Sequence, residues 1–288
     1  MKNRLYKEIA VRASYLTLVV VSFVSSLGFQ TMWTGTSARF NPYFFTNYFV
    51  WTLVMSGLAT LFALIEDFRL LQSGDVTGYT KKYPLLKFCS FSAMIFGLVL
   101  GAFVVDRIGT LRLTDSTAYG SIYPAIATKG YWLDFSLLSS MLLCPVMYIV
   151  TYLLFEEKGQ TREIYSTLGI VPPTLFYLVN KIFGIIMSAV YGGNENLLAA
   201  GKYGVAYPYF FYDDATYSGW WWILLWPTIF GVALVVINKS SYILSRLKRN
   251  ENDKLYYDKT PVDEDKACDI LHPMVVKHRT KKANKNKD

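Results

Sequence analysis

The sequence predicts an all-α fold, a polytopic membrane helix bundle with six transmembrane helices, and three observations carry this prediction. The chain is 53% hydrophobic with a mean hydropathy of +0.27, which is too apolar for an ordinary soluble protein of 288 residues. Six separate stretches are long and apolar enough to cross a bilayer, whose hydrocarbon core takes roughly 20 residues of helix. The positive charge lies almost entirely on one side of these stretches.

Each predicted span must be a helix, because backbone polar groups inside lipid find no water to bond with. After the last span, residues 239–288 are rich in charge of both signs and are expected to form a largely disordered cytoplasmic tail. The six predicted spans are Ala13–Phe29, Tyr43–Ile65, Pro84–Val105, Trp132–Phe155, Thr167–Val190 and Trp220–Asn238.

The first three spans each have a recognisable start. The first follows a basic segment and runs on without a small-residue cleavage site, so we expect a retained helix and not a signal peptide. The second opens on the aromatic and polar run Tyr43–Asn47 and ends at Glu66 and Asp67. The third begins at Pro84, which suits the first turn of a helix because the missing N–H has no partner there.

Prolines and aromatic residues mark the last three spans. Pro145 in the fourth span and Pro172-Pro173 in the fifth should bend these helices or set where they start. The segment 191–219 before the sixth span is rich in tyrosine and phenylalanine, and Trp220–Trp222 continues this pattern. Such aromatic residues are typical of the headgroup region.

The distribution of basic residues predicts the orientation. Of 29 Lys and Arg residues, 23 lie on the segments that would share one face, five lie on the opposite face, and Lys181 lies inside a span. The positive-inside rule then places both termini in the cytoplasm, in a multi-pass protein of the cell membrane. Topology accounts for most of the +8 net charge, so we expect membrane lipids and not nucleic acid as partners. A homo-oligomer or an unidentified membrane partner stays open.

No cofactor or metal site is predicted. The three cysteines, Cys89, Cys144 and Cys268, are too few and too scattered for a disulfide framework. The chain has no CxxC pair and no cluster of histidine with cysteine, so a zinc site is not expected.

Polar side chains within the spans are the candidate functional residues, because burying them in lipid is costly. Thr46 with Asn47 opens the second span, Asp134 lies in the outer part of the fourth, and Asn180-Lys181 lies in the fifth. A pair between Asp134 and Lys181 would neutralise both charges. Thr46 has a simpler alternative, since most membrane threonines bond back to a carbonyl one turn earlier.

The outer segment before the sixth span adds two further candidates for binding, Tyr207 and Tyr209. Tyrosines of this kind either anchor the segment in the headgroup layer or form a lid over an outward-facing pocket.

Three short motifs resemble the androgen-induced-protein superfamily, which includes bacterial six-helix relatives and a mollicute family of unknown function. They are Tyr43–Asn47, Trp132–Asp134 and Tyr207–Asp213, and the resemblance spans roughly residues 1–245. It implies a six-helix intramembrane fold. The animal members are lipid-ester hydrolases that use a threonine in the second helix and a histidine before the fourth. Thr46 matches that threonine, but the histidine has no match, because both histidines of this chain lie in the tail.

Three functions therefore remain open. The first is a membrane protein without histidine-based hydrolase activity, in lipid binding, envelope maintenance or scaffolding. The second is an intramembrane lipid-ester hydrolase in which Thr46 is the nucleophile and Lys181 or Asp134 replaces the histidine base. The third is a small-solute transporter with a cavity framed by the prolines of the fourth and fifth spans and with Lys181 in contact with an anion. No repeat of broken helices supports the third.

Overall fold

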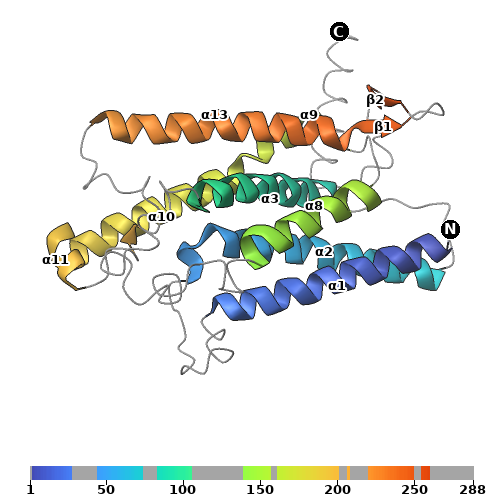
Figure 1. The fold of residues 1–288 in the computed structure, drawn as a ribbon, viewed down its shortest axis with the longest axis horizontal. Helices are drawn as coiled ribbons and strands as arrows, with labels where there is room; N and C mark the ends of the chain where they lie inside the picture. The colour runs from blue at the N-terminus through green and yellow to red at the C-terminus, as the bar shows by residue number, and fades with distance from the viewer. Residues whose placement is uncertain are drawn as a thin grey trace, which may run out of the picture.

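The chain folds into long helices and one short β-hairpin, so the predicted helical class is confirmed (Figure 1). The structure is a computed structural model. It describes residues 2–27, 44–73, 83–105, 139–156, 161–200, 206–207, 220–249 and 254–259.

The first helices are longer than the predicted spans. Helix α1 covers Lys2–Ser26 and starts well before the predicted residue 13, and α2 covers Tyr48–Ser73 and continues past the predicted end at residue 65. Both helices therefore extend beyond the predicted spans, for the same reason. Hydropathy marks the part of a helix that crosses lipid, whereas charged residues that are paired inside the protein continue the helix beyond it. Helix α3 covers Pro84–Val105, as predicted.

A 3-10 turn, η2 (Phe44–Thr46), leads into α2, and Asn47 caps that helix. The Oδ1 atom of Asn47 accepts a hydrogen bond of 3.0 Å from the backbone N–H of Phe49. This bond satisfies one of the N–H groups that have no partner inside a helix. The polar pair at the start of the second span thus includes a helix cap.

The described part of the fourth span contains a bulge. A π-helical turn, η4 (Ser139–Leu143), continues directly into α8 (Cys144–Phe155). Pro145 has no N–H to donate to the preceding turn, and its ring crowds the carbonyl four residues earlier, so the backbone widens there. The predicted local distortion at this proline is confirmed.

The fifth span is two helices and not one. Helix α9 covers Glu163–Leu168 and α10 covers Val171–Val190, with a bend at Gly169 and Ile170. Pro172 and Pro173 cannot donate to the carbonyls of the preceding turn, so the helix is interrupted before them. A short helix, α11 (Asn194–Ala199), follows α10 after two glycines with positive φ.

The last helix also runs past its predicted end. Helix α13 covers Trp220–Ser245, and strands β1 (Leu247–Arg249) and β2 (Leu255–Tyr257) pair in antiparallel orientation after it. Within the predicted tail, residues 239–249 and 254–259 are therefore ordered, while the prediction that residues 239–288 are largely disordered stays a prediction. Residues 260–288 lie outside the described residues.

Helices α2 and α3 form the centre of the bundle. Within their most apolar stretches, 61% of the α2 residues and 67% of the α3 residues are buried. Figure 1 shows α13 above α3 and α1 below α2, with α8 crossing the view between α3 and α1, while α10 leads away toward α11. Helix α13 packs on α3 and α9.

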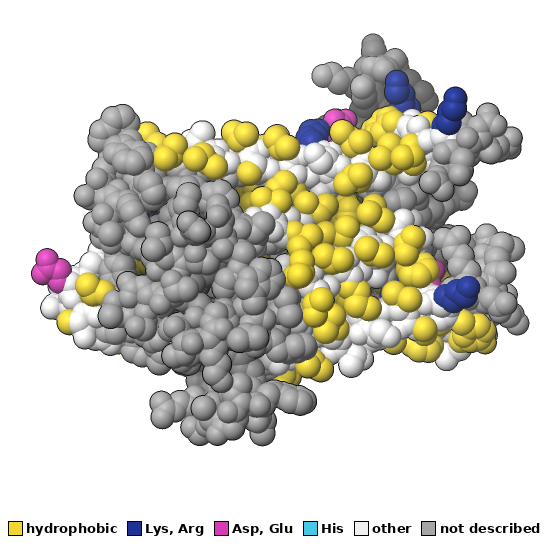
Figure 2. Space-filling view, viewed as in Figure 1, with side chains coloured by type: hydrophobic (Ala, Val, Ile, Leu, Met, Phe, Trp, Pro, Cys, Tyr) yellow, Lys and Arg dark blue, Asp and Glu magenta, His cyan; other side chains and the backbone are white. Residues whose placement is uncertain are grey.

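Five helical segments in the described residues are long and apolar enough to cross a membrane. The described part of the predicted fourth span, Ser139–Phe155, is apolar but shorter. Figure 2 shows apolar side chains over the visible face to the right of the grey region and along its upper edge, with most of the charged side chains toward the right-hand end and along the upper edge. This arrangement is compatible with a membrane protein. The five segments are Leu5–Ser26, Tyr48–Ser73, Pro84–Gly101, Glu163–Val190 and Pro227–Ser245.

Candidate functional site

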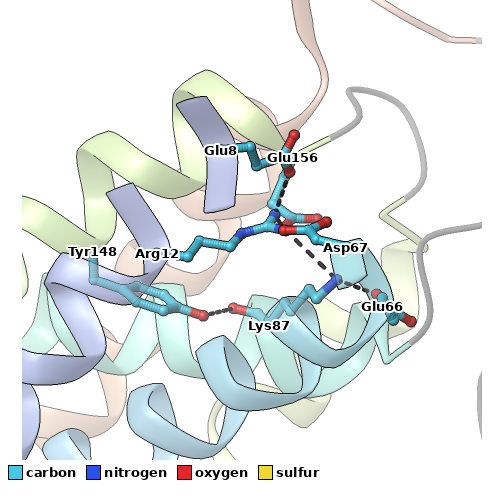
Figure 3. A network of polar contacts seen from close by, with 7 residues as sticks. All are labelled: Glu8, Arg12, Glu66, Asp67, Lys87, Tyr148 and Glu156. Atoms are coloured by element: carbon cyan, nitrogen blue, oxygen red, sulfur yellow. Dashed lines mark hydrogen bonds and ion pairs between the residues drawn. The ribbon is translucent and has the colours of Figure 1, made fainter. Parts of the chain in front are cut away.

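One end of the bundle holds a buried network of ion pairs, drawn in Figure 3. Arg12 of α1 lies at its centre, and its guanidinium contacts three carboxylates. The N–O distances are 2.7 Å to Glu8, 2.5 Å to Asp67 and 2.8 Å to Glu156. These carboxylates come from α1, from α2 and from the residue after α8, so one cation joins three helices.

Lys87 of α3 adds the fourth helix to this network. Its Nζ atom lies 3.2 Å from Glu66 and 3.7 Å from Glu156, and the Tyr148 hydroxyl donates to the Lys87 carbonyl oxygen at 3.3 Å. Glu156 therefore lies between the two cations. Because its members come from four helices, the network fixes the relative positions of these helices at one end.

The charges of this network are taken almost entirely out of solvent. The Arg12, Asp67 and Lys87 side chains are all 3% exposed or less. Burying a charge without a partner costs several kcal/mol. Removing any member of the network would therefore leave a buried charge unpaired and destabilise the fold. Sequence reasoning assigned Arg12 and Lys87 to the basic flanks and missed the network. The available signal was the spacing of Glu8 and Arg12, which places both on one helix face.

Further polar contacts join the helices deeper in the bundle. The Tyr15 hydroxyl of α1 donates to Ser56 of α2 at 2.7 Å. Ser92 of α3 donates to Asn238 Oδ1 of α13, also at 2.7 Å, and Asn238 packs directly against Gly169 at the bend between α9 and α10. A side chain at residue 169 would overlap Asn238, so the close approach of α13 to this bend requires glycine.

Beyond this bend, α10 and α13 are separated by an apolar groove. The groove has a volume of about 240 Å³, and α2 and α3 form its base. Thr174 and Pro227, on opposite walls, are exposed, which shows that the groove is open on one side. Gly231 also lies on its wall, and no atom would come within 4 Å of a Cβ placed there. The structure therefore has free space next to Gly231.

The lining of the groove is almost entirely hydrocarbon. Among the described residues that line it, polar side-chain atoms come only from Tyr48, Thr174 and Tyr177. The Tyr48 hydroxyl already donates to the Ala93 carbonyl oxygen at 3.2 Å. A charged or strongly polar ligand would lose its hydration here without replacement, whereas an apolar one would not. The apolar lining residues are Phe96, Leu100, Ile170, Pro173, Phe176, Pro227, Phe230, Gly231 and Leu234.

Most sequence-predicted site residues that the structure describes lie at the end of the bundle opposite the ion network. Thr46 is buried in η2, and Phe45 next to it packs edge-on against Phe183 of α10 with ring centroids 5.1 Å apart. Tyr207 is buried, and its hydroxyl donates to Asn194 Oδ1 at 3.2 Å. Tyr207 also contacts α10, since its ring lies close to Gly184.

The polar pair of α10 is divided between two environments. Asn180 is buried and its Nδ2 donates to the Phe176 carbonyl oxygen at 3.1 Å, while Lys181 is half-buried. Asp134 and Tyr209 lie outside the described residues, so the proposed pair between Asp134 and Lys181 stays a prediction. Thr46 as a nucleophile also stays a prediction, because Asp134, one of its two proposed bases, lies outside the described residues.

Among the described residues, no group of three His, Cys, Asp or Glu side chains is placed to hold a metal ion. Comparison with known proteins adds no assignment: no protein-family model, no curated protein and no solved structure matches this chain. The resemblance to the androgen-induced-protein superfamily therefore stays a prediction.

Proposed function

We propose that this chain is an integral membrane protein of the cell membrane that binds an acyl chain of a bilayer lipid in the groove between α10 and α13. The observation that carries the proposal is the groove itself, which combines free space, an apolar lining and an open side. Of the three functions left open by the sequence, lipid binding is the one that an apolar cavity favours.

The surroundings of the groove support an acyl chain as the ligand. The flanking helices present apolar side chains outward, including Leu178 and Ile182 of α10 and Val232 and Val235 of α13, each about half exposed. In a bilayer these faces would contact lipid, so an acyl chain could enter the groove sideways without crossing water. Because lipid tails are as apolar as the lining, binding would depend on how well the chain fits the groove.

Photocrosslinking tests this function. The full-length protein is reconstituted in phosphatidylcholine vesicles that contain a phosphatidylcholine with a diazirine on its acyl chain, and the labelled peptides are mapped by mass spectrometry. We expect labelling concentrated in residues 170–177 and 227–234, which form the two walls. Labelling spread evenly over all lipid-facing helices would show only general contact with the bilayer and would contradict the proposal.

A matched pair of variants sharpens the test. Gly231→Leu places a side chain in the free space of the groove, so labelling of both walls should fall. Val232→Leu enlarges the neighbouring side chain, which points outward and is 60% exposed, so labelling should stay at the parent level. Equal labelling of the two variants, with unchanged melting temperatures, would contradict the proposal that the groove binds the acyl chain.

The proposed orientation, with both termini in the cytoplasm, is tested separately. A tag at either end of the chain should be protected from a protease added to intact cells and should become accessible after the cells are opened. A tag that is cleaved in intact cells would overturn the orientation but not the groove.

A further inference from the structure

The β-hairpin after α13 has one mostly apolar face. In an antiparallel pair, residues directly opposite one another point to the same side of the sheet, and Leu247 is opposite Tyr257 while Arg249 is opposite Leu255. Leu247, Arg249, Leu255 and Tyr257 therefore share one face, which is apolar except for Arg249. Tyr256 lies on the other face, opposite Lys248.

This hairpin is firmly attached to the end of α13. The buried Arg246 donates from Nε to the Asp258 carbonyl oxygen at 2.8 Å, and the Asp258 N–H donates to the Arg246 carbonyl oxygen at 3.0 Å. A second donor of the same guanidinium, Nη1, reaches the Thr161 carbonyl oxygen at 3.3 Å. The hairpin thus has a fixed position next to the ends of α13 and α9.

Aromatic rings mark the junction between helix and hairpin. The Arg246 guanidinium lies 5.8 Å from the ring centroid of Tyr242 and 6.0 Å from that of Tyr257. A hydrogen bond with Tyr242 also raises the pKa of the Tyr257 phenol. Tyrosines next to an arginine at the end of a membrane helix are typical of the layer between hydrocarbon and water.

The apolar surface of α13 continues onto the hairpin. Ile243 and Leu244 at the end of the helix are exposed, and Leu255 on β2 is 68% exposed. Lys254 and Lys259 flank β2 and are exposed as well, while Lys248 pairs with Asp258 at 2.6 Å. Over residues 246–259 the chain carries five basic and three acidic residues. An exposed apolar strand bordered by lysines matches a membrane surface, where apolar side chains meet acyl chains and cations meet phosphate.

We propose that the β1–β2 hairpin lies in the headgroup layer of the same bilayer, with its Leu255 and Tyr257 face toward the acyl chains and Lys254 and Lys259 toward anionic headgroups. This inference rests on the membrane placement proposed above. It assigns the hairpin a partner, the anionic headgroup layer, and makes it an anchor that sets the depth of α13.

Fluorescence quenching by labelled lipids tests the anchor in the full-length protein. Single cysteines replace Leu255, Tyr256 or Val235 in a Cys268→Ser background, because Cys89 and Cys144 are buried and do not compete for the label. Each variant carries an environment-sensitive fluorophore and is reconstituted in vesicles of phosphatidylcholine and phosphatidylglycerol with nitroxide lipids. The nitroxide is placed either close to the headgroup or deep in the acyl chain.

We expect the shallow nitroxide to quench the label at residue 255 clearly more than the label at the neighbouring residue 256, which is on the opposite face. The label at residue 235, half exposed in the middle of α13, should be quenched by the deep nitroxide. Equal quenching at 255 and 256 together with quenching at 235 would overturn the anchor and leave the membrane placement intact. A label at 235 that is not quenched would overturn both.

The lysines are tested in the same vesicles. Lys254→Gln and Lys259→Gln should each reduce the quenching of the label at residue 255 by the shallow nitroxide in vesicles with phosphatidylglycerol, since each lysine attracts the hairpin end of the protein to an anionic surface. In vesicles of phosphatidylcholine alone, the two variants should behave like the parent. A response at residue 255 that is insensitive to both substitutions in the anionic vesicles would overturn the role of the headgroup charge.

Discussion

The helices on the two sides of this bundle are held together by different kinds of contact. On one side, α1, α2, α3 and α8 are joined by buried charges and by hydrogen bonds such as that from Tyr15 to Ser56. On the other side, α10 and α13 diverge from the bend at Gly169 and leave a groove between them. In the most apolar stretches, 61% of the α2 residues are buried but only 22% of the α9–α10 residues.

This difference indicates how a membrane protein can combine a fixed part with a part that accepts a ligand. Apolar contacts between helices are weakly specific in lipid, because the lipid tails offer the same contacts. Polar networks are specific, since a shifted helix would leave a buried charge without its partner. The side with the network is thus expected to be rigid, and the apolar side has room to bind.

The largest expected effect comes from removing the central cation of the network. Arg12→Met should lower the free energy of unfolding by about 3–5 kcal/mol, because it leaves buried carboxylates without their cation. The measurement is the unfolding midpoint in a denaturing-detergent titration. Lys7→Met, at an exposed position of the same helix, is the control and should change little. An Arg12→Met protein as stable as the control would remove the difference between the two sides.

A double variant separates the network from general effects on α1. Arg12→Met combined with Asp67→Asn should cost less than the sum of the two single substitutions, because the second removes a charge that the first has left unpaired. The same titration provides the three values. Additive costs would mean that the pair at 2.5 Å does not act as a unit.

A smaller effect is expected at the bend between α9 and α10. Gly169→Ala should cost about 1–3 kcal/mol, because the new Cβ would overlap Asn238 and push α13 away. Gly231→Ala is the matched control, since a Cβ there meets no atom within 4 Å and alanine favours the helix. If both variants have the same melting temperature, the bend does not depend on the contact with Asn238.

The cap of α2 should contribute less again. Asn47→Ala removes the acceptor for the Phe49 N–H and should cost about 1 kcal/mol. Asn47→Asp keeps an acceptor and should restore most of the stability, as seen by thermal unfolding in detergent. A protein that loses as much stability with Asp as with Ala would show that Asn47 acts through other contacts.

The smallest effect is expected for an ion pair outside the core. Lys239 and Glu163 lie 3.3 Å apart, but their side chains are 50% and 75% exposed. Lys239→Met should therefore change stability by at most about 1 kcal/mol, and high salt should cancel the effect. A loss as large as that of Arg12→Met would contradict the conclusion that burial gives the network its strength.

The sequence was sufficient for the helical class and for the approximate positions of the five long apolar helical segments among the described residues, because hydropathy alone decides which stretches suit lipid. Pro145 and Pro172-Pro173 were also sufficient to predict where helices deform, since a missing N–H is a local property. Asn47 was predicted to bind, and this stays a prediction. Its role as the cap of α2 could have been predicted as well, because an Asn directly before an apolar run is a typical helix start.

The ion network and the groove could not be derived in this way. Asp67 and Glu156 each meet Arg12 across long separations in the chain, and no local pattern specifies that contact. The groove is lined by residues of both α10 and α13 and lies beyond the contact of Gly169 with Asn238, so neither helix specifies it by itself. Sequence periodicity describes single helices, whereas the ion network and the groove each form between different helices.

The position of Arg12 also has a consequence for biosynthesis. Glu8 precedes it by 4 residues, whereas Asp67 and Glu156 follow it by 55 and 144 residues. At typical rates of translation, Glu156 leaves the ribosome roughly 7–30 s after Arg12. During that interval Glu8, one turn away, is the carboxylate at hand to neutralise the arginine, and Asp67 joins it when the second helix has been made. Helix α1 therefore contains a counter-ion for Arg12, namely Glu8, before the other partners have been synthesised.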